Sequence, residues 1–249
     1  MSNQDQIPVL NPHDFDTVER TGKTVGCVVL AAGMGTRYAD GNKLLNNIDG
    51  EPIVRRAVRT FLASLDDVVV VIGHDTAAVR KALDGLDVSL VVNKDYDQGQ
   101  STSLHCGVVV GRNRGWDAIV FGLGDMPFVR SETIDLLVRT DVATDYTILA
   151  AAYDRKRGNP TLFDAIHYDA LTEIEGDRGG RQLIVQSDET ALVETSDPGL
   201  PVTSTPLRTT ITIADTIVRT QQEFTMDIET ISRFRVHHEI DRMNCSRSL

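Results

Sequence analysis

The sequence predicts a three-layer α/β/α fold in which helices cover both faces of a mainly parallel sheet. Short apolar runs alternate along the chain with stretches of helical spacing, which is the pattern of such a sheet. A glycine-rich turn follows the first apolar run, and an aspartate follows a later one. The 249 residues, 41% of them hydrophobic, can form one sizeable core. We therefore expect a polar N-terminal extension at residues 1–22 and a single domain over residues 23–249.

Apolar spacing predicts the first elements of the sheet. Thr24–Leu30 is expected to be the first strand and Val68–Ile72 the second. A helix is expected to begin at Pro52, because proline suits the first turn of a helix. The apolar residues that recur on one face of this helix are Ile53, Val54, Ala57, Val58, Phe61 and Leu62.

The next elements repeat the alternation of helix and strand. Asp75 is expected to cap a helix that runs through Leu83. Val88–Val92 and Ala118–Leu123 are the next predicted strands. The second of these leads directly into Gly-Asp-Met-Pro at residues 124–127, so the turn lies at the carboxyl end of a strand.

The segment from Val28 to Lys43 is the most informative part of the sequence, because an apolar strand leads into a glycine-opened turn that ends on cations. Gly33 and Gly35 allow backbone conformations that other residues disfavour, so amide groups can converge on phosphate oxygens. Arg37 and Lys43 add mobile positive charge. The segment therefore predicts a site for the triphosphate of a nucleotide. The alternative is an ordinary strand-to-helix turn that uses glycine for its geometry.

Two other glycine-rich loops fit this segment less well. A P-loop requires G-x-x-x-x-G-K-[ST], but the interval from Gly35 to Gly41 is one residue too long. Leu44 also stands where a P-loop has its magnesium-binding hydroxyl. A dinucleotide fingerprint needs a third glycine where this chain has Tyr38. A dinucleotide-dependent oxidoreductase is therefore disfavoured, and NAD(P) binding would be its test.

Asp125 lies where open α/β sheets bind ligands, at the carboxyl end of a predicted strand. Reaction at the phosphates of a bound nucleotide increases their negative charge, and a magnesium ion can neutralise that charge. Because magnesium keeps several waters, one or two carboxylates suffice to hold it. The alternative is that Asp125 is a simple turn residue.

Two polar segments have both a structural and a functional interpretation. Residues 98–103 form a polar loop in which Ser101 or Thr102 can cap the next helix, yet their hydroxyl groups could also contact phosphate or ring heteroatoms. Asp177 and Arg178 can form a surface ion pair, which would add little stability.

Charge and composition exclude several classes of partner. A formal net charge of −11 argues against nucleic acid, which is normally met by a basic face. No apolar run approaches the ~18 residues needed to span a bilayer, so we expect a cytoplasmic protein with no membrane partner. The three cysteines lack disulfide or zinc spacing. Only five of the 25 cationic residues are lysines, which suggests adaptation to high salt or simply a genome rich in arginine codons.

Several motifs together resemble the pyrophosphorylase-type nucleotidyltransferases, the MobA-like NTP transferase family. The first is Leu-Ala-Ala-Gly-x-Gly-x-Arg at residues 30–37, followed by Lys43. The motifs similar to the molybdenum cofactor cytidylyltransferase branch are the run 93–107, GDMP at 124–127, GNP at 158–160 and GDRGGR at 176–181. Ala32 matches the cytidine-associated form of the loop, whereas guanylyl-transferring relatives tend to carry a glycine there.

The resemblance implies a Rossmann-like fold of the nucleotide-diphospho-sugar transferase type, and transfer of CMP from CTP to molybdopterin-type molybdenum cofactor with release of pyrophosphate. It implies catalytic roles for Arg37, Lys43 and Asp125. The implied nucleotide-binding residues are Leu30, Ala31, Ala32, Gly33, Gly35, Arg37, Lys43, Asn93 and Ser101. The implied residues on the pterin side are Ser103, Gly158, Asn159 and Pro160. A recipient molybdoenzyme is a further expected partner.

The chain departs from the family pattern near its C-terminus. That pattern has a second metal carboxylate shortly after an Asp-Pro-Gly turn. Here the turn is present at residues 197–199, but the following Val202–Pro206 contains no carboxylate. Asp227 is the candidate replacement, and we expect it to bind Mg²⁺ or Mn²⁺ together with Asp125. Residues 200–249 are therefore expected to be a divergent C-terminal part.

The expected mechanism needs no covalent intermediate, because the acceptor phosphate is already an anionic nucleophile. Positioning and charge stabilisation would carry the catalysis. Two alternatives stay open. The acceptor could be a sugar phosphate or another phosphorylated alcohol, or GTP could be the donor. Because the second carboxylate is missing from its usual place, the protein could also be a non-catalytic nucleotide- or cofactor-binding protein.

Overall fold

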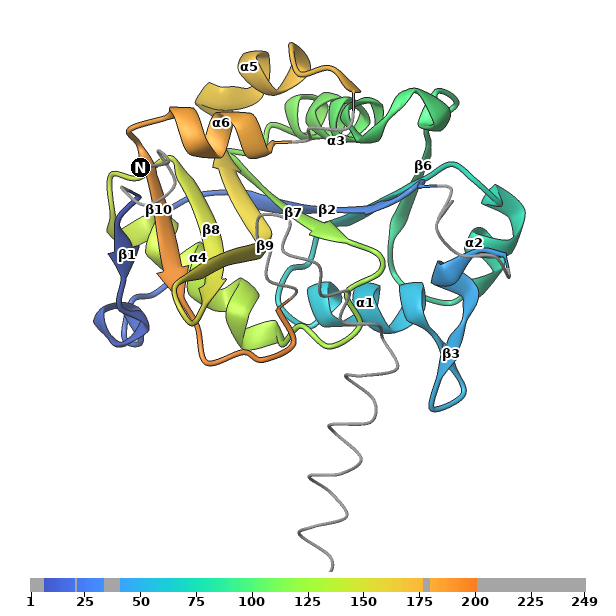
Figure 1. Cartoon of the computed structure of the whole chain (residues 1–249), viewed down its shortest axis with the longest axis horizontal. Helices are drawn as coiled ribbons and strands as arrows, with labels where there is room; N and C mark the ends of the chain where they lie inside the picture. Colours follow the sequence, from blue (N-terminus) through green and yellow to red (C-terminus); the bar gives the residue numbers. More distant parts are fainter. Residues whose placement is uncertain (1–6, 21, 34–40, 177–179, 201–249) are drawn as a thin grey trace, which may run out of the picture. The chain divides into compact units, whose positions relative to one another are not determined.

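The computed structural model describes residues 7–20, 22–33, 41–176 and 180–200 (Figure 1). The chain divides into two units, Met1–Ser204 and Thr205–Leu249, and all of the described residues belong to the first. They form an eight-stranded sheet with helices on both faces, together with a two-stranded sheet. The predicted three-layer α/β fold with a mainly parallel sheet is confirmed.

The main sheet has the strand order β1-β10-β8-β9-β7-β2-β5-β6. Within it β9 runs antiparallel to both of its neighbours, and the other pairs are parallel. The bounds of its strands are Val9–Leu10 (β1), Val25–Ala31 (β2), Val68–Ile72 (β5), Ser89–Val92 (β6), Ala118–Leu123 (β7), Ile148–Tyr153 (β8), Lys156–Asp164 (β9) and Thr190–Glu194 (β10). The small sheet pairs β3 (Asn47–Ile48) with β4 (Glu51–Pro52).

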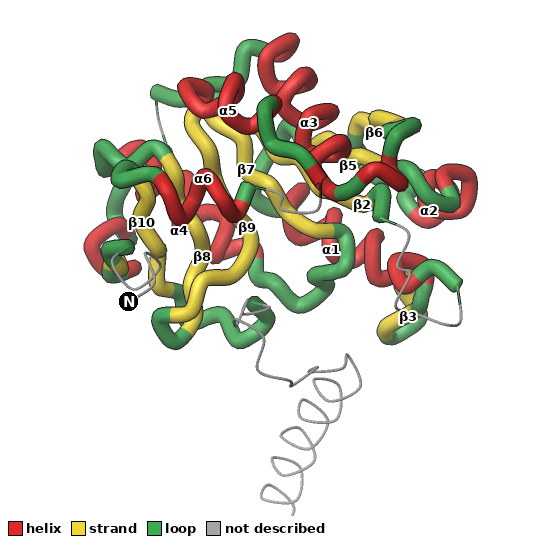
Figure 2. The backbone as a smooth tube through the Cα atoms, turned by 45° about the horizontal axis from the view of Figure 1, so that its top comes forward, coloured by secondary structure: helices red, strands yellow, loops and turns green. Residues whose placement is uncertain are grey.

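Helices cover both faces of the main sheet, as Figures 1 and 2 show. The helices on one face are α1 (Ile53–Leu62), α2 (Thr76–Ala82) and α4 (Ser131–Ala143), and those on the other are α3 (Gln100–Arg114), α5 (Tyr168–Thr172) and α6 (Arg181–Gln186). Short 3₁₀ turns lie at Pro12–Phe15, Lys43–Leu45, Tyr96–Gln98 and Ala165–His167. In the part of the chain that the structure describes, no helix has the length and apolar character needed to cross a membrane.

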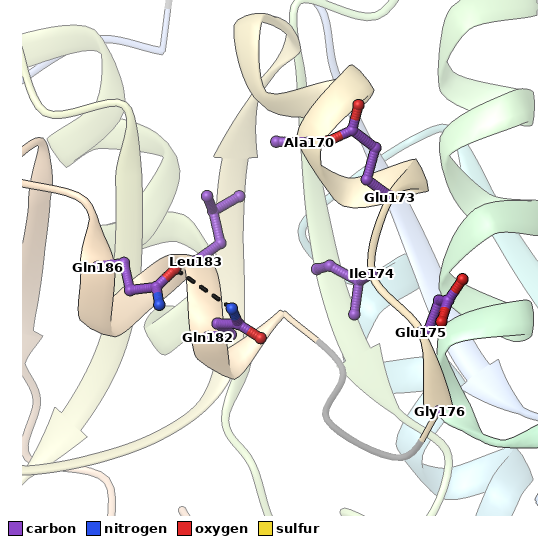
Figure 3. A pocket seen from close by; sticks show the side chains of 8 residues that line it. All are labelled: Ala170, Glu173, Ile174, Glu175, Gly176, Gln182, Leu183 and Gln186. Atoms are coloured by element: carbon purple, nitrogen blue, oxygen red, sulfur yellow. Dashed lines mark hydrogen bonds between the residues drawn. The ribbon is translucent and has the colours of Figure 1, made fainter.

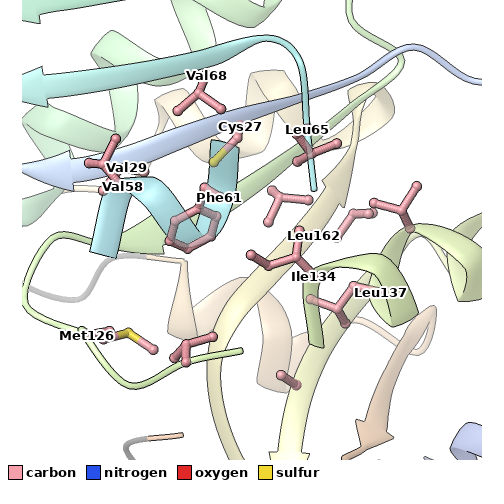
Figure 4. Packing of buried hydrophobic residues seen from close by; sticks show 14 of the residues in the cluster. Cys27, Val29, Val58, Phe61, Leu65, Val68, Met126, Ile134, Leu137 and Leu162 are labelled. Carbon is pink, nitrogen blue, oxygen red and sulfur yellow. The ribbon is translucent and has the colours of Figure 1, made fainter. Parts of the chain in front are cut away.

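Successive side chains of the central strands enter two cores, because strand residues alternate between the faces of a sheet. Val29 faces the core beneath α1 and α4, where it packs with Phe61, and its neighbour Val28 faces the core beneath α3 (Figure 4). A Cβ on Gly122 would lie 2.1 Å from Cζ of Phe61. Glycine at this position therefore lets α1 pack closely on β7.

The strands with the strongest patterns lie where the sequence predicts them, and the helix expected from Pro52 begins one residue later. Val68–Ile72 and Ala118–Leu123 are strands with the predicted ends, and β2 differs from its prediction by one residue. Helix α1 begins at Ile53 and buries the predicted face. These elements place the carboxyl ends of β2, β5 and β7 side by side.

One predicted helix cap is confirmed in its position and the other is wrong. Asp75 is the N-cap residue of α2, but its backbone is left-handed, with φ of 51°, and its side chain makes no capping hydrogen bond. Helix α3 begins at Gln100, one residue before the expected caps, so its N-cap is Gly99 and Ser101 lies inside the first turn. The hydroxyl group of Thr102 instead donates to the carbonyl oxygen of Gly99 at 2.9 Å.

The N-terminal segment differs from the predicted polar extension. Val9 and Leu10 form the edge strand β1, which pairs in parallel with Leu192 and Val193 of β10. Phe15 is buried in the core that lies beneath α4. A two-residue strand has no periodicity that a sequence pattern can reveal, so this pairing is visible only in the fold.

Candidate functional site

The carboxyl ends of the parallel strands β7 and β2 lie side by side at one edge of the sheet. The parallel register pairs Leu30 with Leu123. The amide of Gly124 then donates to the carbonyl oxygen of Leu30 at 2.9 Å. A Cβ on Gly124 would lie 3.0 Å from Cβ of Ala31, so a larger residue at position 124 would crowd the end of β2. This pairing places the start of the glycine-rich loop next to the turn that carries Asp125.

Lys43 and Asp125 form an ion pair at this edge. Nζ of Lys43 lies 3.1 Å from Oδ2 of Asp125. Lys43 begins a 3₁₀ turn whose cap, the buried Asn42, accepts a hydrogen bond from the amide of Leu44 at 3.1 Å. The side chains of Lys43 and Asp125 are 26% and 41% exposed. The turn thus positions Lys43, and both side chains of the pair are partly exposed.

The Asp125 carboxylate fits a divalent cation that also binds substrate phosphates. Its oxygens are the hard ligands that Mg²⁺ and Mn²⁺ prefer, and it is exposed at a strand end. Over the described ranges, no three His, Cys, Asp or Glu side chains gather in a metal-binding cluster. A cation here would therefore take one carboxylate from the described residues and its other oxygens from phosphates and water. The second predicted ligand, Asp227, lies outside the described residues.

Gly33, at the end of β2, has no structural need for glycine among the residues described. It is not one of the glycines with positive φ, and a Cβ built on it meets no atom within 4 Å. Among the described residues, the missing side chain leaves open space at this position. Gly35 and Arg37, which the sequence also assigns to this loop, lie outside the described residues.

The residues that lead into this loop are apolar and offer no polar side chain to a ligand: Leu30, Ala31 and Ala32. Ala31 and Ala32 are each 2% exposed and belong to opposite cores. The carbonyl oxygen of Ala32 accepts from the amide of His74 at 3.1 Å. These residues fix the point at which the backbone leaves the sheet.

Asn93 follows β6 at the same edge, but its side chain is engaged inside the protein. Its Nδ2 donates to the hydroxyl oxygens of Thr102 at 2.8 Å and Ser103 at 2.9 Å. Its Oδ1 accepts from the amide of Asp95 at 2.9 Å. Both amide hydrogens are thus used to hold the first turn of α3. Ser101 and Ser103 are also buried in that turn.

The predicted acceptor residues lie toward the same edge of the sheet. Thr161 of β9 pairs with Phe121 of β7 in an antiparallel ladder. Residues that precede Thr161 therefore extend toward the carboxyl end of β7, where Asp125 follows. Of the three predicted residues, Gly158 and Pro160 are buried and Asn159 is partly exposed. The fold thus brings the nucleotide and acceptor segments to one edge.

Arg157 is a candidate functional residue, next to the acceptor segment, that the sequence analysis missed. It precedes Gly158 and is only 5% exposed. Burial lowers the pKa of its guanidinium, and the nearby charge of Arg181 lowers it further. Two cations therefore approach each other on the acceptor side. The run Arg155–Arg157, in a chain with few lysines, was the available signal.

A cavity of about 700 Å³ opens between α5 and α6, away from the Lys43–Asp125 pair (Figure 3). It is lined by Ala170, Glu173, Ile174, Glu175, Gly176, Gln182, Leu183 and Gln186. None of these is a predicted site residue or a cation. Among the described residues its lining carries two carboxylates and no cation, which does not favour a triphosphate.

Comparisons with known proteins bear on the family and the fold. A model of the MobA-like NTP transferase domain matches residues 27–191. A nucleotidyl transferase from Methanothermobacter thermautotroptrophicus, Mth528, is similar in structure, with a TM-score of 0.61 and 29% identity over 71% of this chain and 89% of that one. Rv0371c from Mycobacterium tuberculosis H37Rv, solved in complex with manganese, has a TM-score of 0.57 and 26% identity over 69% of this chain and 88% of that one.

Similarity to a curated protein covers a smaller region. The bifunctional protein GlmU of Nitratidesulfovibrio vulgaris is 32% identical over 128 residues, which are 51% of this chain and 28% of that protein. The chain therefore matches only about a quarter of the length of this relative.

Proposed function

This chain belongs to the MobA-like NTP transferase family, and we propose that it transfers CMP from CTP to the terminal phosphate of a molybdopterin-type molybdenum cofactor. Nucleotidyl transfer is the reaction class of the family. The observation that carries the proposal is the pair formed by Lys43 and Asp125 at the carboxyl edge, 3.1 Å apart. One residue suits a triphosphate and the other suits the cation that accompanies it.

In the proposed reaction, an oxygen of the acceptor phosphate attacks the α-phosphorus of CTP. A new phosphorus–oxygen bond forms, the bond to the bridging oxygen of the β-phosphate breaks, and pyrophosphate leaves with that electron pair. A divalent cation held by Asp125 neutralises charge on the phosphates when bound. Lys43, with Arg37, binds and orients the triphosphate, and the open space at Gly33 admits it. The protein therefore contributes to catalysis by positioning the reactants and stabilising charge.

Cytidine as the base and Asp227 as the second metal ligand are parts of the same proposal. The loop form with Ala32 supports cytidine. Rv0371c, which is 26% identical, was solved in complex with manganese, and this supports a divalent cation as the cofactor. A recipient molybdoenzyme is the proposed destination of the product.

A second candidate keeps the reaction and gives the nucleotidyl group to a sugar phosphate or another phosphorylated alcohol. The acceptor segment is compatible with it, because among residues 158–160 only Asn159 has a polar side chain. Such a segment contains little that is specific for a pterin ring.

The test offers the full-length protein CTP, GTP, ATP or UTP with Mg²⁺ or Mn²⁺ and either molybdenum cofactor or a panel of sugar phosphates. Product mass identifies both the base and the acceptor. The proposal predicts a cytidine dinucleotide form of the cofactor and an equal amount of pyrophosphate. A product on a sugar phosphate alone would establish the second candidate, and nucleotide binding without pyrophosphate release would contradict both.

A further inference from the structure

Asp197 is a buried carboxylate whose two oxygens are both engaged by other parts of the chain. It follows β10 and is 2% exposed. Its Oδ2 accepts from the amide of Arg130 and from the hydroxyl group of Thr133, each at 2.8 Å. Its Oδ1 accepts from the amide of Gly199 at 2.9 Å. The side chain therefore joins the segment after β10 to the start of α4.

The loop that Asp197 holds is the one that carries Asp125. This loop, residues 124–130, connects β7 to α4. Nε of Arg56 donates to the carbonyl oxygen of Pro127 at 3.2 Å, and the Arg56 guanidinium lies 5.7 Å from the ring centre of Phe128. Asp197 holds the last residue of the loop, beyond the contacts of Arg56. The loop is thus fixed from α1 on one side and from the β10 segment on the other.

Gly199 shows how closely the β10 segment approaches this loop. A Cβ on Gly199 would lie 2.0 Å from the carbonyl oxygen of Phe128. That atom belongs to backbone, so a side chain at position 199 would displace the loop. The two segments therefore pack backbone against backbone, with the Asp197 carboxylate beside the contact.

We propose that Asp197 is a positioning residue that holds the Asp125 loop in the conformation that binds the divalent cation. The inference rests on the proposed function, in which Asp125 holds that cation. A single carboxylate gives a cation little affinity unless its position is fixed, because ordering a mobile loop opposes binding. Groups that orient metal ligands typically change metal affinity by about 10- to 100-fold when removed.

The experiment measures Mn²⁺ affinity of the full chain by electron paramagnetic resonance, and the Mn²⁺ dependence of nucleotidyl transfer. Asp197→Asn removes the charged acceptor, and Gly199→Ala displaces the loop while keeping the carboxylate. Asp141→Asn is the matched control, because Asp141 is also buried, lies on α4 and pairs with Lys23 at 2.9 Å, at the opposite edge of the sheet. Asp125→Ala defines the loss of the cation ligand itself.

We expect Asp197→Asn and Gly199→Ala each to weaken Mn²⁺ binding about tenfold and to raise by a similar factor the Mn²⁺ concentration for half-maximal transfer. The rate at saturating Mn²⁺ should stay within about threefold of the wild type, since Asp197 touches no substrate. Asp141→Asn should lower the melting temperature without changing Mn²⁺ affinity.

The outcomes separate this inference from the proposed function. If Asp125→Ala binds Mn²⁺ as tightly as the wild type, the metal role of Asp125 is wrong. If Asp125→Ala loses the cation but Gly199→Ala and Asp197→Asn bind it normally, the positioning role is overturned and the proposed function stands. Where Asp197→Asn fails to fold, Gly199→Ala alone decides.

Discussion

Nζ of Lys43 lies 3.1 Å from Oδ2 of Asp125, although 82 positions separate the two residues in the sequence. The side chain suited to the triphosphate thus neutralises the side chain suited to the cation. A divalent cation that takes the carboxylate would release the lysine toward the phosphates. Binding of the cation and binding of the nucleotide are therefore expected to reinforce each other.

Lys43→Ala should lower kcat/KM for nucleotidyl transfer by about 10²- to 10³-fold, because a charged donor to the triphosphate is lost. Mn²⁺ affinity without nucleotide should not fall, since the carboxylate loses its competitor. Steady-state pyrophosphate release and Mn²⁺ titration check the two parts. Lys81→Ala, at an exposed position of α2, is the matched control and should behave as the wild type. Normal transfer by Lys43→Ala would refute the role of the lysine.

Asp125→Asn should abolish metal-dependent transfer with little effect on folding, because the side chain is 41% exposed and, among the described residues, forms an ion pair with Lys43. Calorimetric titration with Mn²⁺ should show loss of the site. Asp87→Asn changes an exposed aspartate elsewhere and should change neither quantity. Retention of both Mn²⁺ binding and turnover in Asp125→Asn would exclude the carboxylate as a ligand.

Asn93→Ala should lower the free energy of unfolding by about 1–3 kcal/mol, because the hydroxyl groups of Thr102 and of the buried Ser103 lose a donor. Urea denaturation measures this change. Asn113→Ala, at an exposed position of α3, the helix that contains Thr102 and Ser103, should change stability little. An unchanged stability together with weaker CTP binding would show instead that Asn93 contacts the nucleotide.

Gly122→Ala should destabilise the protein by about 1–3 kcal/mol, because its Cβ would overlap the ring of Phe61. Adding Phe61→Leu to this variant should restore part of the loss, since it removes the atoms that clash. Thermal and urea unfolding of the two single variants and the double variant give the coupling free energy. Strictly additive effects would contradict the contact.

Stability should fall as the pH decreases through about 6.5, because burial lowers the pKa of His167 in the folded protein. The unfolded chain then takes up the proton first, so the stabilisation present above this pH is lost below it. Urea denaturation at pH 7.5 and pH 5.5 measures the change. His167→Gln, which keeps a donor for the hydroxyl group of Thr147, should show a smaller change. An equal change in both proteins would assign it to other groups.

The parts of the fold predicted from the sequence are those with strong local patterns. Val68–Ile72 is an unbroken β-branched run, so its bounds were predicted accurately. Helix α1 has a sharply divided apolar face, so its start was predicted to within one residue. The β8–β9 hairpin was not predicted. Its turn residues, Asp154 and Arg155, both have positive φ, and the sequence there lacks the glycine that normally marks such a turn.

Part of the candidate site could likewise be predicted from local sequence patterns, and part of it could not. Lys43 and Asp125 were predicted from the residue types that follow two strands, and the parallel register then brought them together. The link from Asp197 to Arg130 spans 67 positions and depends on close packing at Gly199, so no local pattern indicates it. The internal hydrogen bonds of Asn93 were hidden for the same reason.

The most direct test of the account follows the α-phosphorus of labelled CTP in the presence of Mn²⁺ and molybdenum cofactor. The account predicts that the label moves to the cofactor in the wild type, with pyrophosphate released in equal amount, and stays in CTP with Lys43→Ala or Asp125→Asn. Transfer at the wild-type rate by either variant, or no transfer to any phosphorylated acceptor by the wild type, would contradict it.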